Sequence, residues 1–440
     1  MPILPVMSRV LALDVGSSSV KAAALEGARV VGGVARVEFP TRFAADRAEI
    51  RPTDLFAAVA QAVNRIGRTA RRCEFIALAA LGPSWVAIDA RGHPLTPIVT
   101  HQDRRSVAQA RFIEDTFGAS RHLRIVGARP FPGGISSTTC RWFGEHHASL
   151  LRRADLIGHV PTLLHRAWCG TRVIDTSHAS FTGLFRTTSL KGWDDELCEL
   201  ARVRPSQLPR IVQANDIGGR LSRSAAAELG LPAGMPMLAG IMDGSVPMLL
   251  AGARPGRIVN VIGTTDVLAV CVDRPRPHPL LLTRALGIGK LWLAVSTMAA
   301  GGATIGWLRD TFFADLSDAQ FHRAVRTRAR EHGLTVAPFL AGSRVSIEQR
   351  SASFSGLTLS TSRTDLLHAA ITALAAESAA RVRLLRELGI GLDRQVLVAG
   401  GERHLNRIMH ARWPGRWRFR SLAGGAIAGL GALARPAEVR

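Results

Sequence analysis

Short apolar runs alternate with turn residues in the N-terminal part of the chain. Each run is bounded by Gly, Ser, Asp or Pro, which is the pattern of β-strands rather than helices. The predicted strands are residues 10–13, 20–25, 29–39 (one strand or two), 75–81 and 85–89. The turn at 16–19 joins the first two strands, so the chain opens as a β-meander and not as a strand-to-helix P-loop.

Helical spacing of apolar residues begins at Pro52 and continues to Ile66. Residues 106–210 are mostly helical in pattern, with breaks at the Pro and Gly residues of 130–134. A long helix begins at Ser362, and Gly389 ends it. Strands between helices of this kind predict an α/β protein.

The second half of the chain adds further strands. They are predicted at residues 237–243, 258–262, 267–272 and 396–399, and a glycine-rich helix start follows at 423–426. Residues 291–308 carry no charge, but their Ser, Thr and Gly residues favour strand, turn and helix over a membrane span. No membrane association is therefore predicted.

Two segments half a chain apart share one plan. Residues 11–20 and 259–267 both read apolar strand, Gly, two or three hydroxyl residues, apolar strand. An internal duplication explains the likeness, and a chance match is the alternative. The duplication predicts two related α/β domains with a cleft between them, each opening with a hairpin whose turn is rich in N–H and O–H donors.

The chain has 440 residues, of which 47% are hydrophobic, so it can form large cores. Lys plus Arg number 56 and Asp plus Glu 34, a net charge of +22. Lys occurs only at 21, 191 and 290, and Arg is spread along the whole chain, so most of this charge is expected on a solvated surface. The five cysteines form no CxxC motif and the N-terminus lacks a signal peptide, which predicts a cytoplasmic protein.

The two hairpin turns and two aspartates are the candidates for chemistry. A turn of Gly and Ser or Thr between two strands directs several N–H groups one way and can surround a phosphate without a lysine. Asp14 ends the first strand, where Mg²⁺ would bridge to phosphates, or where its carboxylate would simply accept turn N–H bonds. Asp243 ends the strand at 237–243, where it would take the proton of an attacking hydroxyl or serve as an Asp-Gly turn residue.

With these residues in place, the chain resembles the FGGY family of carbohydrate kinases, in the actin-like (ribonuclease H-like) ATPase superfamily, from about Val10 to Ala434. The order of motifs carries the resemblance. The segments that resemble family motifs are 13–21 (first phosphate loop), 86–95, 102–105, 175–184, 240–244 (catalytic G-x-x-D-G), 263–265 (second phosphate loop), 338–344 and 400–401 (adenosine segment).

The resemblance implies two actin-like domains, each a mixed sheet flanked by helices: an N-terminal domain at 1–252 and a C-terminal domain at 253–440. It implies ATP-dependent phosphorylation of a hydroxyl of a sugar, polyol or sugar acid, with Asp243 as general base and Asp14 organising Mg²⁺. The implied ATP contacts are Gly16, Ser17, Ser18, Lys21, Gly263, Thr264, Thr265, Gly400, Gly401 and Asn406. The implied substrate contacts are Ser84, Trp85, Asp103 and Asp243, and a homodimer is left open.

The chain also departs from the family pattern. Xylulose-type members carry G-Q-M-H-G where this chain has Leu81-Gly82-Pro83-Ser84-Trp85, so the polar Gln and His are missing. Ser343 replaces the Glu of a G-E-R motif, and Glu402 replaces a Gly of the adenosine loop. These changes predict a substrate other than D-xylulose, and the sequence does not name it.

Two other classes of function are compatible with parts of the sequence. The segment 412–420 is rich in Arg and aromatic residues, which would suit single-stranded nucleic acid. Its arginines at 416, 418 and 420 alternate with Trp417 and Phe419, which is also the pattern of a half-buried strand with a basic outer face. The second interpretation is favoured, so no nucleic-acid partner is predicted. The serious alternative to a kinase is a non-catalytic, nucleotide-binding relative with a sensing or regulatory role.

Overall fold

The computed structural model describes residues 9–327, 333–348, 350–422 and 425–433. The described chain forms two compact units. Unit 1 consists of residues 9–254, 271–294 and 425–433, and unit 2 of residues 255–270 and 295–422. The predicted glycine-rich helix start lies partly outside the described residues, because 423 and 424 are not among them.

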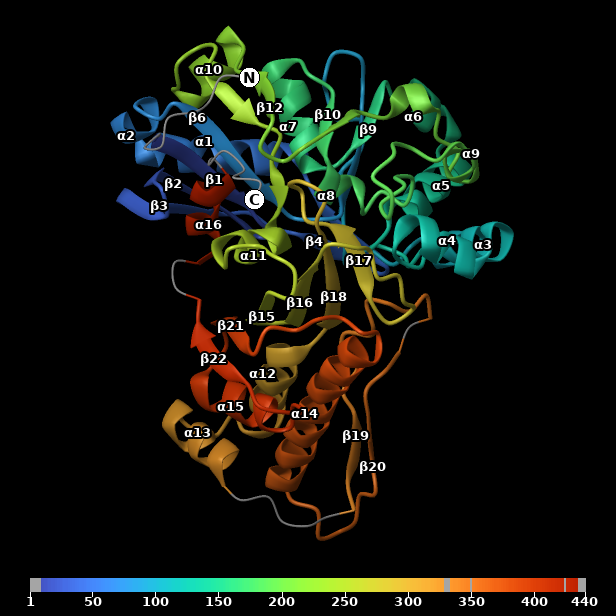
Figure 1. Ribbon diagram of the computed structural model, residues 1–440, viewed down its shortest axis with the longest axis vertical. Helices are drawn as coiled ribbons and strands as arrows, with labels where there is room; N and C mark the ends of the chain where they lie inside the picture. Colours follow the sequence, from blue (N-terminus) through green and yellow to red (C-terminus); the bar gives the residue numbers. More distant parts are fainter. Residues whose placement is uncertain (1–8, 328–332, 349, 423–424, 434–440) are drawn as a thin grey trace. The chain divides into compact units, whose positions relative to one another are not determined.

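A mixed sheet organises unit 1 (Figure 1). Its strand order is β12-β13-β6-β1-β2-β3, and β14 also pairs with β6. The meander predicted at the N-terminus is confirmed, because β1 pairs antiparallel with β2 and β2 with β3. The bounds are β1 Arg9–Val15, β2 Ser19–Glu26, β3 Arg29–Glu38, β6 Phe75–Ala80, β12 Ile217–Arg220, β13 Pro236–Leu238 and β14 Ile241–Met242.

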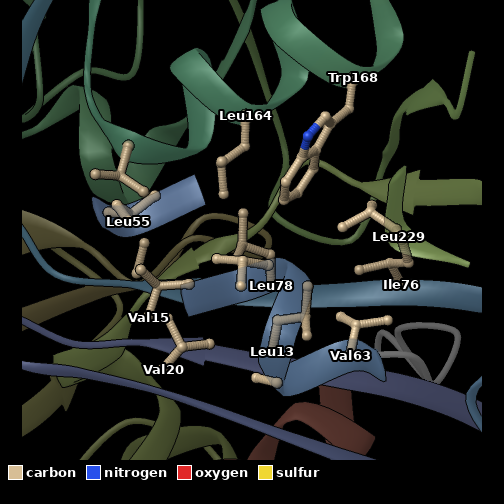
Figure 2. Close-up of a cluster of buried hydrophobic side chains, with 14 of the residues drawn as sticks. Leu13, Val15, Val20, Leu55, Val63, Ile76, Leu78, Leu164, Trp168 and Leu229 are labelled. Carbon is tan, nitrogen blue, oxygen red and sulfur yellow. The ribbon is translucent and has the colours of Figure 1, made fainter. Parts of the chain in front are cut away.

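This sheet is apolar on both faces, which explains why β1 reads as one continuous apolar run. Successive side chains of a strand point to opposite faces. Leu11, Leu13 and Val15 pack against one set of helices, whereas Val10 and Ala12 pack against another. Figure 2 shows the first face, where Leu13 and Val15 of β1 lie among side chains of α1 (Pro52–Ile66) and α7 (Val160–Cys169).

The second face is covered by α11 (Val246–Leu250) and α16 (Gly425–Leu433). Asp14 follows the parity of Val10 and Ala12, so it belongs to this face. The sequence alternation therefore fixes the side of the sheet on which the predicted site lies.

Unit 1 contains further elements besides this sheet. A second sheet has the order β4-β5-β8-β7-β9, and β10 pairs with β11. The strands are β4 Arg42–Ala44, β5 Arg47–Ile50, β7 Ser84–Ile88, β8 Ile98–Thr100, β9 Leu156–Gly158, β10 Val173–Asp175, β11 Arg210–Val212 and β17 Leu282–Ala285. The further helices are α2 Arg68–Arg71, α3 Val107–Phe117, α4 Ala119–Val126, α5 Ser136–His146, α6 Ala148–Arg153, α8 Thr176–Ala179, α9 Asp195–Leu200 and α10 Arg223–Leu229, with 3-10 turns at Pro205–Gln207 and Asp243–Ser245.

The prediction of one continuous strand at 237–243 is wrong. It is two short strands, β13 and β14, and Gly240 between them has φ +94°. A Cβ at this position would lie 3.1 Å from the carbonyl oxygen of Leu78, so the chain bends where only glycine fits comfortably. Asp243 then begins a 3-10 turn instead of ending a long strand.

Unit 2 repeats the plan of unit 1. β15 pairs antiparallel with β16 and parallel with β21, and β21 pairs parallel with β22. In unit 1, β1 likewise pairs antiparallel with its hairpin partner and parallel with β6. The predicted duplication of a donor-rich hairpin is thus matched by the topology.

Four elements of unit 2, predicted at 258–262, 267–272, 396–399 and from Ser362 to Gly389, lie within two residues of their predicted bounds. The uncharged segment 291–308 forms a strand and the start of a helix, as expected, and no helix among the described residues is long and apolar enough to cross a membrane. The strands are β15 Ile258–Ile262, β16 Asp266–Val272, β18 Trp292–Met298, β19 Thr335–Ala337, β20 Ser353–Ser355, β21 Gln395–Gly400 and β22 Arg418–Ser421; β16 and β18 each run across a boundary between the units. The helices are α12 Gly301–Phe312, α13 Asp318–Arg326, α14 Arg363–Glu387 and α15 Arg403–Ala411.

The basic segment at 412–420 differs from the prediction of a half-buried strand. Only residues 418–421 form a strand, and all four are exposed because β22 is an edge strand beside β21. Phe419 is 40% exposed and lies flat against His410, with ring centroids 4.2 Å apart. The buried aromatic residue of the segment is Trp413, whose Nε1 donates to Ser378 Oγ.

Candidate active site

Two carboxylates lie at one edge of the central sheet of unit 1. β1 and β14 both run parallel to β6 and flank it, with Asp14 and Ile241 both in register with Ala79. Asp14 is the last residue but one of β1, and Asp243 follows directly after β14. Two interstrand spacings of about 4.8 Å place these strands about 10 Å apart. The carboxyl ends of parallel strands are where ligands bind in α/β folds.

Asp14 is 7% exposed and has a cross-strand partner. Lys21 lies opposite it in the β1–β2 register, and its Nζ is 3.4 Å from Asp14 Oδ2. Burial raises the pKa of Asp14, and the Lys21 ammonium opposes this rise without cancelling it. The pairing holds Asp14 in place and moderates the cost of its burial.

Asp243 has a different environment. Burial raises the pKa of its carboxyl to about 6, and the charge of Asp14 adds to the rise. The N–H of Gly244, which donates to Asp243 Oδ1 at 2.6 Å, opposes the rise, as do His178 and Arg284. A carboxylate with a pKa near neutrality is suited to accept a proton from a hydroxyl.

The segment that begins at Asp175 supports this edge. Asp175 caps the short helix α8 and accepts hydrogen bonds from the N–H and Oγ of Ser177. Ser177 Oγ in turn accepts the N–H of Met242 at 2.9 Å. The backbone immediately before Asp243 is therefore tied to a buried, hydrogen-bonded carboxylate.

The same segment holds a histidine and a second strand. His178 Nδ1 lies 2.5 Å from Asp175 Oδ2, and its Nε2 lies 3.3 Å from the carbonyl oxygen of Ala80 at the end of β6. Ser180 Oγ accepts the N–H of Ala285 at 3.0 Å, which anchors β17. The sequence motif at 175–184 is thus a scaffold that joins the ends of β6, β14 and β17.

Arg284, on β17, brings a buried positive charge to the edge. Its side chain donates from Nη1 to Ser245 Oγ, and a Cβ on Gly244 would lie 3.3 Å from its Nη2. It therefore lines the turn that carries Asp243. Burial lowers the pKa of Arg284 to about 10, and the charges of Asp243 and Asp175 oppose this.

The first predicted phosphate loop has backbone donors available. Gly16 N–H closes the turn on Ser19 O, and Ser18 O accepts the N–H of Phe39. Among the described residues, no hydrogen bond is recorded for the N–H groups of Ser17 and Ser18. Two donors therefore remain for an anion.

The second predicted loop, in unit 2, is built the same way. Gly263 N–H closes on Thr265 O, while Gly263 O and Thr264 O accept the N–H groups of Gly302 and Ala303 at the start of α12. A Cβ at Gly302 would lie 2.3 Å from Gly263 O, so only glycine allows the helix to approach the loop this closely. Gly301 and Gly302 were not among the predicted site residues, although an adjacent glycine pair before a helix is a recognisable signal.

The predicted adenosine segment lies at the end of β21. Asn406 Nδ2 donates to Gly400 O at 3.0 Å, so Asn406 braces the Gly400–Gly401 turn from within unit 2. Glu402 caps α15, because its carboxylate accepts the N–H groups of His404 and Leu405. Partial burial works to raise the pKa of Glu402, but these two bonds outweigh it and the pKa is lowered. The departure at Glu402 thus has a local structural role.

The predicted substrate contacts of the N-terminal region are turned into the protein. Ser84 Oγ accepts the N–H of Val160 and donates to Leu81 O, and Trp85 Nε1 donates to Cys140 Sγ. Asp103, which is fully buried, pairs with Arg105 and accepts the N–H of Ala48. Contact of these three residues with a substrate stays a prediction.

Comparison with known proteins gives the family. The N-terminal domain model of the FGGY family of carbohydrate kinases matches residues 9–249, and the C-terminal domain model matches residues 258–411. The chain belongs to this family. It is an ATP-dependent carbohydrate kinase.

Relatives within the family differ in their named substrates. The chain is 27% identical to the gluconokinase of Bacillus subtilis (strain 168) over 384 residues, 83% of this chain and 74% of the relative. It is 25% identical to the xylulose kinase of Streptomyces rubiginosus over 406 residues, 90% and 78% of the two chains. Xylulose kinase from Rhodospirillum rubrum has the same fold, with a TM-score of 0.86, 23% identity and coverage of 97% of this chain and 89% of that one.

The site is compatible with the nucleotide and metal that FGGY kinases use. Mg²⁺ in kinases is usually held by one or two carboxylates, water and phosphate oxygens, and not by a dedicated protein cage. Asp14 offers one carboxylate at the strand end, and the described residues contain no cluster of three or more His, Cys, Asp or Glu side chains that could hold a metal. The Ser17 and Ser18 N–H groups described above would meet phosphate oxygens.

Proposed function

We propose that this kinase transfers the terminal phosphoryl group of Mg·ATP to a hydroxyl of a sugar, polyol or sugar acid other than D-xylulose. Asp243 acts as the general base that takes the hydroxyl proton. Asp14 orients Mg²⁺, which when bound neutralises phosphate charge. The loops at Gly16–Ser18 and Gly263–Thr265 hold the phosphates, and Gly400, Gly401 and Asn406 flank the adenosine.

The placement of Asp243 is the observation that carries the proposal. Its carboxyl has a pKa of about 6, it stands at the carboxyl end of parallel strands, and it is on the same edge as Asp14. The backbone before it is fixed by Ser177. A base must be ionised near neutral pH yet basic enough to accept a proton, and this environment supports both.

Exclusion of D-xylulose rests on the segment 81–85. Ser84 bonds within the protein, and the polar Gln and His of xylulose-type members are absent from this stretch. A pocket without those groups lacks hydrogen-bond partners for the hydroxyls of a ketopentose. Hydroxyls left without partners lower kcat/KM for that substrate relative to others.

The test measures ADP release with Mg·ATP across ketoses, aldoses, polyols and sugar acids, with Asp243→Asn and Asp115→Asn in parallel. Asp115 is an exposed carboxylate on α3, so its variant controls for the loss of one charge. A substrate-dependent signal that falls at least ~100-fold in Asp243→Asn alone supports the proposal. ATP binding without any substrate-dependent ADP release would support the non-catalytic alternative instead.

A further inference from the structure

Three arginine side chains are buried in the described chain: Arg105, Arg284 and Arg381. Arg105 forms ion pairs with Asp103 and Glu49, and Arg381 with Asp266. Arg284 is 2% exposed and, among the described residues, forms no ion pair with a carboxylate. Its recorded hydrogen bond goes to the neutral hydroxyl of Ser245.

A buried charge without a carboxylate in direct contact is costly, even where Asp243 and Asp175 act on it from a greater distance, and proteins rarely keep one without a use for it. A guanidinium has five N–H donors arranged to meet a carboxylate with two parallel hydrogen bonds. One of these donors is taken by Ser245, so most of the donor capacity of Arg284 is left over.

The free N–H donors of Arg284 lie beside the turn that carries Asp243, where the substrate hydroxyl would react. Nη1 bonds the residue two positions after Asp243, and Nη2 lies beside Gly244. The Phe181 ring is also near, with its centroid 5.9 Å from the guanidinium carbon of Arg284. Ala285, the next residue, is anchored by Ser180, so the strand that carries Arg284 is fixed to the scaffold of the base.

We propose that Arg284 is a specificity-determining residue that binds the carboxylate of an acidic acceptor, so that the substrate class of this kinase is the sugar acids. This inference rests on the proposed function, because it places the acceptor beside Asp243. Asp243 and Asp175 alone would repel an anionic substrate, and Arg284 offsets that repulsion. The missing polar groups at 81–85 agree with recognition through a charge elsewhere.

The experiment compares kcat/KM for aldonates and uronates with kcat/KM for the alditol of the same chain length and configuration. The variants are Arg284→Gln, Arg284→Lys and the control Arg274→Gln, which removes an exposed arginine of the same unit. In the wild type, the best acid is expected to exceed its alditol by at least ~30-fold. Arg284→Gln should reduce kcat/KM for the acid at least ~10-fold more than kcat/KM for the alditol and so remove that advantage. Arg284→Lys should retain part of the advantage, and Arg274→Gln should change neither value.

Two results would overturn the inference. One is a wild-type enzyme that phosphorylates neutral acceptors as well as their acids. The other is an equal loss on acid and alditol in Arg284→Gln, which would make Arg284 a partner of Asp243 alone. If Arg284→Gln fails to fold, the ratio of kcat/KM for acid and alditol in the wild type and in Arg284→Lys still tests the inference.

Calorimetric titration of the same acids without ATP separates this inference from the proposed function. Selective acid binding that Arg284→Gln abolishes, without turnover in the wild type, would uphold acid recognition and refute phosphoryl transfer. Turnover of neutral acceptors without acid binding would uphold phosphoryl transfer and refute acid recognition.

Discussion

Replacing Asp243 by Asn should remove activity and stabilise the folded protein at neutral pH. The side chains have nearly the same shape, and the Asn oxygen can still accept the N–H of Gly244. The amide has no charge to desolvate and is not repelled by Asp14. The pKa of Asp243 rises from an ordinary 3.8 to about 6, a difference of about two pH units. At 1.36 kcal/mol per unit, ionised Asp243 destabilises the native state by about 3 kcal/mol.

The pH dependence of this effect has a definite sign. Because the pKa of Asp243 is higher in the folded than in the unfolded chain, its effect on stability becomes unfavourable as pH rises. Below pH 3.8 the carboxyl is protonated in both states and the penalty vanishes. Above pH ~6 the full penalty applies, and at pH 5 about half of it remains. Activity follows the ionised base, so kcat/KM of the wild type should fall as pH drops below about 6.

The assay is urea unfolding of wild type, Asp243→Asn and Asp115→Asn at pH 5.0 and pH 7.5. Asp243→Asn should raise the free energy of unfolding by up to about 3 kcal/mol at pH 7.5 and by about half as much at pH 5.0. Asp115→Asn should stay within about 0.5 kcal/mol of wild type at both. Equal stability of Asp243→Asn and wild type at pH 7.5 would refute the argument that a charged base with a raised pKa occupies this edge.

Three further predictions test other parts of the site. Asp14→Ala should raise the Mg²⁺ concentration needed for half-maximal ADP release, and an unchanged Mg²⁺ dependence would remove Asp14 from the metal role. Ser177→Ala leaves the N–H of Met242 without its acceptor, so kcat should fall about tenfold or more, an effect of about 1–3 kcal/mol. The ATP affinity measured by calorimetry should stay unchanged, and Ser177→Thr should restore activity. Glu402→Ala removes the cap of α15 and should cost about 1 kcal/mol in urea unfolding at pH 7, a loss that shrinks as pH falls through the lowered pKa of Glu402; a large change in ATP affinity would instead place Glu402 at the nucleotide.

Much of the fold follows from local signals in the sequence. Alternation and turn residues locate the two hairpins, and the capping box at Ser362 and Asp365 marks the start of α14. These features depend on residues within a few positions of each other. The break at Gly240 depends on the carbonyl of Leu78 in the neighbouring strand, so no window of sequence around residues 237–243 contains its cause.

Some residues of the candidate site are likewise marked by local signals in the sequence, and others are not. Asp14, Asp243 and the two hydroxyl-rich turns are recognisable because strand ends and glycine turns mark them. Arg284 is not, because its partner Ser245 is 39 positions away and one arginine among many carries no mark in the sequence. The surroundings of Asp103 are equally invisible in the sequence, because its carboxylate accepts the N–H of Ala48, 55 positions earlier in the chain.

The two carboxylates at the sheet edge differ in a way that matches their proposed roles. Asp14 has Lys21 across the hairpin, and a metal ligand must remain ionised throughout the reaction. Asp243, among the described residues, has no ion pair and bonds only the adjacent N–H of Gly244. A direct ion pair would lower its pKa and make it a weaker base, whereas backbone anchoring through Ser177 fixes its position without doing so. The scaffold at Asp175 therefore separates the positioning of the base from the control of its charge.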